Sequence, residues 1–483
     1  MKSRRLTEKN IFLPLNRRRF MLGASAVLLA PSISVLADDV PVSSDGYRVL
    51  TAGKTTAQLL GKDKPKTSVW AYNGTNPGPV IRVKQGEKVK IRLINKLDQP
   101  TSIHWHGIRI DNAMDGVTGL TQEPVKSGES FDYEFIARDA ETYWYHTHNR
   151  SWEQLARGLY GMLIVEEPDA PKYRELNLVL DDWRINKDGS FDEQSMGALH
   201  DWAHGGRLGN YLTVNGQPKP AIDVTTGERL RLRIVNVANS RIMKLNIADH
   251  DPWLIALDGH PVTPRKLRKG DLVLGPAQRV DLVVDGKLKP GTKSPIQFVS
   301  DRQSIDIATI NYTTGELATP AVFTPPSGLP VTMPHGGFDL AAAKTVGLNM
   351  SGGAMGSMDR AMLGGKMLDW RQLVREKRVW AFNGIAGDLD KPLTQVKKGE
   401  TVKIDIVNDT AFPHAMHLHG HHFTVVARNN MSVAERIWRD TELVYPNEKI
   451  SFAFLADNPG KWLFHCHMIE HQAGGMMTWI NVA

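Results

Sequence analysis

The chain contains 483 residues, of which 41% are hydrophobic and 23% are charged. These proportions are ordinary for a globular protein, and the length suggests about two to four domains. The net charge is +7, but residues 1–37 hold seven Lys or Arg and one acid, which leaves 52 basic and 51 acidic residues in the remainder. Because the remainder is nearly neutral, its charge gives no reason to expect nucleic-acid binding.

The first 37 residues follow the order of a secretory signal. Arginines at 17–19 precede a mildly apolar run, and Val35-Leu36-Ala37 forms a small-residue cleavage pattern. Paired arginines are typical of twin-arginine signals. We therefore expect a bacterial protein that the twin-arginine translocase exports to the periplasm. A membrane anchor is the alternative, but the run is shorter than the roughly 20 apolar residues of a stable membrane span.

The chain then repeats one pattern three times. An Asn-Gly pair recurs and is followed each time by a Gly-Glu turn and a segment of alternating apolar and polar residues. The alternating segments cover residues 83–95, 224–236 and 396–408. Strict alternation is the signature of a strand with one buried face. The sequence therefore predicts an all-β fold.

Repeats of this length predict three β-sandwich domains with Greek-key connections. We place the domains at residues 44–168, 172–315 and 376–483. Residues 316–375 are rich in Pro, Gly and Met and are expected to form a connector. Helical periodicity is confined to short stretches near 153–160 and 355–375.

The first and third repeats carry His-x-His pairs that the second lacks. One pair in each repeat begins 17 residues after the glutamate of the Gly-Glu turn, and another begins 17 residues after Glu129 or Glu448. Residues i and i+2 of a strand point to the same face, and imidazole is a good copper ligand. Packed or surface histidines would explain one pair, but four pairs in register indicate a metal cluster between two domains. The pairs are His104 and His106, His146 and His148, His417 and His419, and His465 and His467.

Cys466 is the only cysteine, so no intrachain disulfide can form. It lies between His465 and His467, with His471 five residues later and Met476 five beyond that, while His414 precedes the third histidine pair. Two imidazoles, a thiolate and a weak axial thioether make a blue-copper electron-transfer site. The backbone around Cys466 would join such a site to the histidine cluster.

At these motifs the chain resembles the three-domain bacterial multicopper oxidases, the group of laccases and copper-efflux cuprous oxidases. The resemblance implies cupredoxin-like domains and four copper ions that reduce dioxygen to water with four electrons. It implies a type 1 copper on His414, Cys466, His471 and Met476, and a type 2 copper on His104 and His417. It implies a type 3 pair on His106, His146 and His467 for one ion, and His148, His419 and His465 for the other.

Family members also use carboxylates to deliver protons to reduced oxygen, a general-acid role. Asp115, in Met114-Asp115-Gly116, matches one of these acids. We expect Asp115 to serve as such an acid, and a turn-forming aspartate is the alternative. The other usual acid follows the type 1 histidine, where this chain has Gln472, which cannot donate a proton in that way.

The electron donor is less determined than the chemistry at oxygen. Met355, Met358 and Met362 lie in the connector, and thioether sulfur suits Cu(I), so we expect Cu(I) oxidation in copper tolerance. The same three methionines would share one face of a short amphipathic helix and could simply pack there. A phenol or Mn(II) is the alternative donor, and a non-catalytic copper-binding envelope protein is the alternative function. A monomer is expected. Seven other histidines are interpreted as surface or structural residues, namely His200, His204, His250, His260, His335, His421 and His422.

Overall fold

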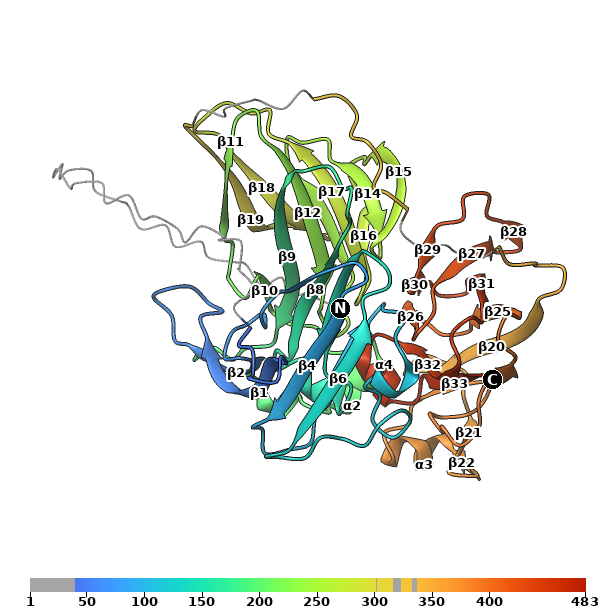
Figure 1. Cartoon of the computed structure of the whole chain (residues 1–483). Helices are drawn as coiled ribbons and strands as arrows, with labels where there is room; N and C mark the ends of the chain where they lie inside the picture. The colour runs from blue at the N-terminus through green and yellow to red at the C-terminus, as the bar shows by residue number, and fades with distance from the viewer. Residues whose placement is uncertain (1–39, 301, 316–322, 332–336) are drawn as a thin grey trace, which may run out of the picture.

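The computed structural model describes residues 40–300, 302–315, 323–331 and 337–483 (Figure 1). The expected signal at 1–37 lies outside these residues. Most strands belong to six sheets, which form three sandwiches of two sheets each. Among the described residues there is no helix with the length and hydropathy needed to cross a bilayer.

The first sandwich contains the strands β1 (Arg48–Ala57), β2 (Thr67–Tyr72), β3 (Ile81–Lys84), β4 (Lys88–Asn95), β5 (His104–His106), β6 (Ser130–Ile136), β7 (Thr142–His146) and β8 (Tyr160–Glu166). The second contains β9 (Arg174–Trp183), β10 (Tyr211–Val214), β11 (Ala221–Thr225), β12 (Arg229–Asn236), β13 (Met243–Ile247), β14 (Trp253–Leu257), β15 (His260–Lys266), β16 (Leu272–Leu274), β17 (Arg279–Asp285), β18 (Lys293–Val299) and β19 (Ser304–Thr313).

The third sandwich contains β20 (Lys344–Gly352), β23 (Trp380–Phe382), β24 (Thr394–Val396), β25 (Thr401–Asn408), β26 (His414–Leu418), β27 (Phe423–Arg428), β28 (Met431–Ser432), β29 (Trp438–Arg439), β30 (Thr441–Val444), β31 (Lys449–Leu455), β32 (Gly460–Cys466) and β33 (Met477–Val482). A separate hairpin consists of β21 (Arg360–Leu363) and β22 (Lys366–Asp369). The short helices are α1 (Ser151–Gln154), α2 (Leu199–Ala203), α3 (Trp370–Arg375) and α4 (Ile469–Ala473), with 3-10 turns at Asn112–Met114 and Glu193–Ser195.

The three sandwiches repeat one topology, as the sequence repeat predicts. In each, the first strand pairs in parallel with the strand that follows the Gly-Glu turn, namely β1 with β4, β9 with β12 and β20 with β25. In each, the opposite sheet holds a matching parallel pair, namely β3 with β8, β11 with β19 and β24 with β33. The histidine-bearing strands β5 and β26 occupy equivalent positions in the first and third sandwiches.

Three expectations from the sequence need correction. The segment 316–375 is not only a connector, because β20 pairs along β25 inside the third sandwich. The stretch 355–375 is helical only in α3, since a hairpin with a Gly364-Gly365 turn precedes it. Alternation predicted one buried face for 224–236, but β12 is buried on both, because Arg231 and Arg233 form ion pairs with Glu167 of the first sandwich.

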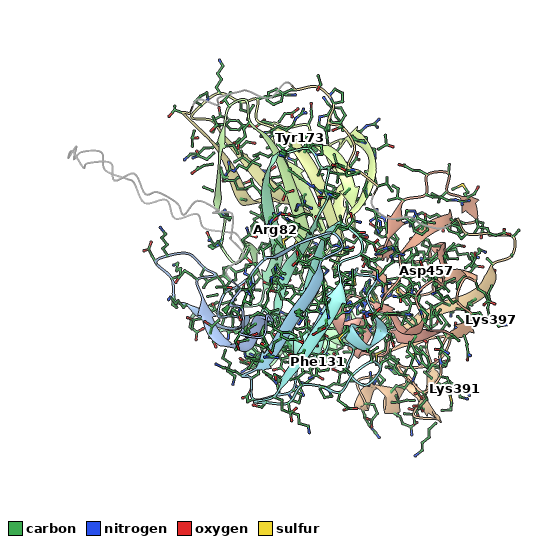
Figure 2. All side chains as sticks on the ribbon, viewed as in Figure 1. Arg82, Phe131, Tyr173, Lys391, Lys397 and Asp457 are labelled. Carbon is green, nitrogen blue, oxygen red and sulfur yellow. The ribbon has the colours of Figure 1, made fainter. Side chains whose placement is uncertain are left out.

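The sandwiches pack against one another through buried and half-buried ion pairs. Figure 1 shows the second sandwich above the first, with the third beside them and α4 at their junction. Arg82 of β3 contacts Glu175 of β9 at 2.8 Å, and Arg109 contacts Asp457 of the third sandwich at 3.1 Å; Arg82 and Asp457 are labelled in Figure 2. The histidine-bearing strands of the first and third sandwiches therefore face each other across a fixed boundary.

Candidate metal centre

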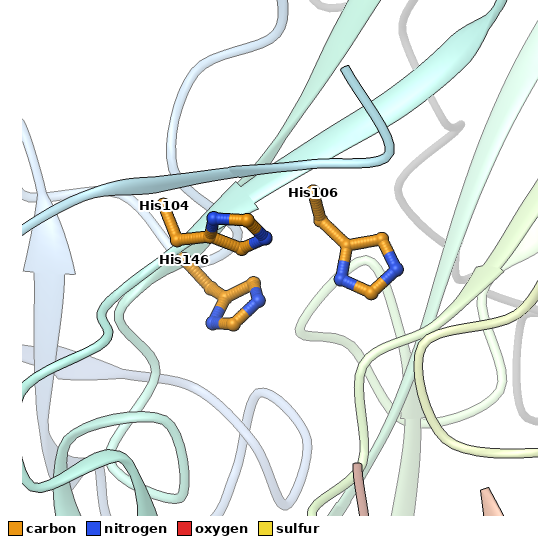
Figure 3. A group of neighbouring side chains, drawn as sticks. All are labelled: His104, His106 and His146. Atoms are coloured by element: carbon orange, nitrogen blue, oxygen red, sulfur yellow. The ribbon is translucent and has the colours of Figure 1, made fainter. Parts of the chain in front are cut away.

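The strand register brings the histidine pairs together within each sandwich. The antiparallel pairing of β5 with β7 sets His104 opposite His146, and that of β26 with β32 sets His417 opposite His465. Figure 3 shows His104, His106 and His146 with their rings turned toward a common space. The eight side chains of the four pairs are all buried.

The histidines of the two sandwiches also meet across the boundary. The ring of His104 stacks on that of His419 with centroids 3.9 Å apart, and the ring of His106 stacks on that of His417 at 3.8 Å. His146 Nε2 lies 3.4 Å from His467 Nε2. His148, His419 and His465 form a further group in which one nitrogen of each ring lies within 4.8 Å of the other two. The structure thus brings together all eight histidines that the sequence selected.

The ring nitrogens show which lone pairs face the common space. Nδ1 of His104 donates to the carbonyl of Asp115 at 2.8 Å, and Nδ1 of His417 donates to the carbonyl of Asp440 at 2.8 Å. The Nε2 atoms of both rings are buried and have no hydrogen-bond partner among the described residues. His106 has the opposite arrangement, because its Nε2 lies 3.0 Å from Asp440 Oδ1 and its Nδ1 is the nitrogen without a partner. A buried lone pair without a partner is costly, and a metal cation would satisfy these three.

The site keeps its imidazoles in the form that binds metals. Burial, together with neighbouring histidines, lowers the pKa of His106, His146 and His417 well below the ordinary value. Burial lowers the pKa of His465 to about 3. These rings are therefore neutral at physiological pH, and neutral imidazole is the metal ligand.

A second group lies on the other side of the β32 backbone. Cys466 Sγ is 3.6 Å from His414 Nδ1 and 3.9 Å from His471 Nδ1, and the two Nδ1 atoms are 3.0 Å apart. His471 Nε2 donates to the carbonyl of His204 at 2.6 Å, which leaves the Nδ1 lone pair for a metal. Met476 is fully buried, and its carbonyl accepts from the Cys466 amide. Burial raises the pKa of Cys466 to about 12, so metal binding must displace the thiol proton.

Comparison with known proteins identifies the family. Three family models described as multicopper oxidase match residues 52–170, 139–292 and 363–483. A multicopper oxidase structure from Pseudomonas thermotolerans is 34% identical, with a TM-score of 0.78, and the match covers 90% of this chain and 98% of that one. The chain belongs to the multicopper oxidase family. It is therefore an oxidoreductase, and its membership implies that it binds copper.

Two curated relatives of this oxidase extend the likeness over most of its length. Multicopper oxidase MmcO of Mycobacterium tuberculosis is 29% identical and is aligned over 86% of this chain and 83% of its own. A copper resistance protein A homolog of Pseudomonas syringae pv. tomato is 26% identical, over 90% of this chain and 92% of its own. The fold of the oxidase is accordingly that of cupredoxin-like domains.

Asp115 and Gln472 occupy the two positions considered for proton delivery, and their surroundings differ. Asp115 is buried against the histidine cluster, where its Oδ2 accepts from Nδ1 of His419 at 2.9 Å. Gln472, on α4, lines a cavity of about 260 Å³ that also reaches His148 and Arg378. The carboxyl that the sequence predicts near the histidines is therefore in contact with them, and the amide faces a space that leads toward them.

Sequence reasoning missed a group of residues that supports the cluster. Arg279, from the second sandwich, is fully buried and donates to Asp440 Oδ1 at 2.9 Å, while Asp440 contacts His106. The guanidinium also donates to the carbonyls of Thr142 and Asp258, at 3.0 and 2.9 Å. One side chain thus joins all three sandwiches beside the histidines. No local motif marks it, because its partners are distant in sequence.

The three methionines do not share a helical face. Met355 is 68% exposed, whereas Met358 is 8% exposed and belongs to a small apolar cluster with Leu373. Met362 lies in β21, paired with Met367 across the hairpin. The Ala354 amide donates to the carbonyl of Ala203, at the end of α2, so Met355 lies next to the segment that covers His471.

Proposed function

We propose that the protein is a four-copper oxidase that takes electrons singly from a reductant and passes four of them to dioxygen, making water. The nitrogens without partners in the histidine cluster carry this proposal, because they are donors that copper would satisfy. His414, Cys466, His471 and Met476 would hold the type 1 ion. His104 and His417 would hold the type 2 ion. His106, His146 and His467 would hold one type 3 ion, and His148, His419 and His465 the other.

The bound copper ions supply the one-electron steps and the reduction of dioxygen, and the chain supplies their connection. Cys466 lies at the end of β32 and faces His414, while its neighbours His465 and His467 face the histidine cluster. Two short covalent paths, each starting at the Cys466 backbone, therefore join the two sites. An electron accepted beside Cys466 needs no change of conformation to reach the cluster.

Protons must reach the same cluster, since each dioxygen consumes four of them. Asp115 is the carboxyl that we assign to this task, because its Oδ2 contacts His419 and its backbone carbonyl fixes the His104 ring. Gln472 cannot release a proton, and water in the cavity that it lines would carry protons there instead. Asp115 is therefore a general acid, while Gln472 limits the rate of proton supply.

Cu(I) is the donor that we propose, with copper tolerance as the role. The relative named copper resistance protein A homolog supports it, as does the exposed thioether of Met355. His471 is fully buried, and its outer nitrogen is engaged by the His204 carbonyl, so a phenol cannot donate to that ring directly. We further propose export to the periplasm, on the paired arginines near the N-terminus.

The test is oxygen uptake by the copper-loaded protein with Cu(I) and, separately, with 2,6-dimethoxyphenol. We expect four Cu(I) consumed per dioxygen without release of peroxide, and a lower rate with the phenol. Cys466→Ser is the matched variant, because it keeps every histidine and removes electron entry. Uptake that is unaffected by this substitution, or copper binding without any uptake, would contradict the proposal and favour a copper-binding envelope protein.

A further inference from the structure

The cavity beside Gln472 has cationic walls. Its volume is about 260 Å³, and the described residues that line it include Arg150 and Arg378 but no aspartate or glutamate. The Arg150 side chain is 53% exposed, so the cavity reaches solvent beside it. The buried His148 belongs to the same lining, so the cavity runs from solvent to the histidine cluster.

Arg378 is the cation of this cavity that no carboxylate of the described residues pairs with. Its guanidinium is half-buried, and one N–H group donates to the carbonyl of Ala473 at 2.6 Å. Burial lowers the pKa of Arg378, and the exposed Glu376 offsets only part of that effect. Arginine stays charged all the same, and its remaining N–H groups favour an anion. Arg150 differs, because Glu153 pairs with it at 2.8 Å.

A second donor in the same lining has no acceptor among the described residues. Trp202 is 7% exposed, and its Nε1–H is buried without a hydrogen-bond partner there. An indole N–H can only donate, so it calls for an acceptor. Lys377 adds positive charge nearby, with its Nζ 5.8 Å from the centre of the Trp202 ring. These donors and charges agree that the ligand which fits the cavity is an anion.

The shape and the apolar walls of the cavity select the class of anion. A guanidinium presents parallel N–H groups that match a carboxylate. The rings of Trp152 and Trp202 meet edge to face with centroids 5.8 Å apart, and Met477 lines the same cavity, so a short alkyl group has apolar surface to contact. The volume lies below the roughly 300–1,000 Å³ of drug-sized pockets. Gln472 contributes a neutral amide, which does not balance Arg378. A small carboxylate such as formate or acetate fits these features.

We infer that the cavity binds a small carboxylate against Arg378 and that this ligand carries protons toward the histidine cluster. The binding stands on the geometry of the cavity, whereas the role in proton transfer rests on the proposed function. The O–H bond of the bound acid breaks, and its proton passes to cavity water on the cluster side. The carboxylate left behind takes a proton from solvent beside Arg150. Each cycle moves one proton and no electron, so four cycles serve one dioxygen. The ligand thus performs the general-acid step that Gln472 cannot.

Calorimetric titration of acetate into the copper-loaded enzyme tests the binding. The wild type should bind one acetate that Arg378→Gln does not bind, and Arg378→Lys, which keeps the charge but loses the planar fork, should bind it about tenfold more weakly. Gln472→Glu should also lose the site, because the introduced carboxylate pairs with Arg378. Arg375→Gln is the matched control and should keep the site, since Arg375 is exposed at the end of α3 and does not line the cavity. Acetate held by a copper ion instead would persist in all four variants, which would overturn the inference.

Oxygen uptake at saturating phenol, fixed pH and fixed ionic strength tests the role. Acetate should raise the turnover of the wild type and of Arg375→Gln about threefold or more, and should leave that of Arg378→Gln unchanged. Chloride has the same charge but carries no proton, so it should displace acetate and remove the gain. Acetate binding without any gain in turnover overturns the inferred role while the proposed function stands. If no donor supports oxygen uptake, the proposed function and the role fail together, and the titration still decides whether the site exists.

Discussion

Replacing Arg279 by Met tests how strongly the second sandwich supports the histidine cluster. The guanidinium is fully buried and lies 2.7 Å from Asp440, 3.7 Å from Glu141 and 3.9 Å from Asp258. Neither carboxylate oxygen of Glu141 has a hydrogen-bond partner among the described residues. Methionine has a similar reach and no charge, so Asp440 would lose the guanidinium that pairs with it, whereas Asp258 would keep Arg439 at 3.6 Å.

The expected cost follows from this geometry. Removing one partner of a buried ion pair costs about 3–5 kcal/mol, because the other charge stays buried without compensation. Arg279 serves more than one carboxylate and also donates to two backbone carbonyls, so the upper end, about 5 kcal/mol, applies. For a single sandwich of about 150 residues, a loss of about 5 kcal/mol lowers Tm by roughly 10–20 °C. Arg279→Lys keeps the charge but loses the planar fork, and should cost about half as much.

The assay is calorimetric unfolding of the copper-loaded variants with their copper content measured in parallel. We expect the order wild type, Arg279→Lys, Arg279→Met for both Tm and copper retained. In the double variant with Asp440→Asn, the loss should be smaller than the sum of the two single losses, since the paired charge is then absent. A Tm within about 3 °C of wild type for Arg279→Met, with full copper, would refute the reasoning.

Further outcomes are expected for stability, copper content and turnover. Gly116→Ala should destabilise the fold far more than Gly119→Ala in denaturant unfolding. Both glycines have a positive φ, so they differ only in their surroundings. A Cβ on Gly116 would lie 1.8 Å from a backbone oxygen, whereas Gly119 faces open space. Chelating the copper should lower Tm, since a ligand that binds only the folded state stabilises it. Cys466→Ser should lose the blue absorption while keeping the other copper ions. Gln472→Glu should raise the turnover of oxygen uptake by restoring an acid beside the cavity. Burial and Asp440 raise the pKa of Asp258 to about 7. The folded state therefore holds an extra proton between about pH 4 and 7, and its free energy of unfolding falls as the pH rises through that range. Asp258→Asn should make the free energy of unfolding less dependent on pH over the same range.

The histidine cluster was predictable because its geometry is local. Two imidazoles on one strand face share a side whatever the tertiary structure, and the equal offsets placed four such pairs on equivalent strands. The sheet register then sets His417 opposite His465 as part of the same pattern. Cys466 was predictable for the same reason, since a single thiol between two histidines is a pattern typical of a copper ligand. The assignment of individual ligands to copper ions stays a prediction.

The supporting residues were not predictable in this way. Asp440 contacts His106 across 334 residues of sequence, and Arg279 reaches Asp440 across 161. Nothing near either residue marks it, because the contact depends on how whole sandwiches pack. Arg231 looked solvent-facing for the same reason.

The methionine segment did contain a local signal that the helical interpretation passed over. Gly364 and Gly365 both adopt positive φ and close a two-residue hairpin turn, which Gly-Gly between apolar runs predicts. The periodicity of the methionines was compatible with a helix, but the turn residues decide the structure.

The division of the histidines between two sandwiches also sets when copper chemistry can begin during synthesis. His417 follows His148 by 269 residues. At about 5–20 residues per second, a growing chain carries the first four histidines for roughly 15–50 s before their partners leave the ribosome. During that time the first sandwich has half a cluster and no thiol, so it cannot deliver electrons to oxygen. Under the proposed function, oxygen chemistry therefore has to wait until the third sandwich has been synthesised.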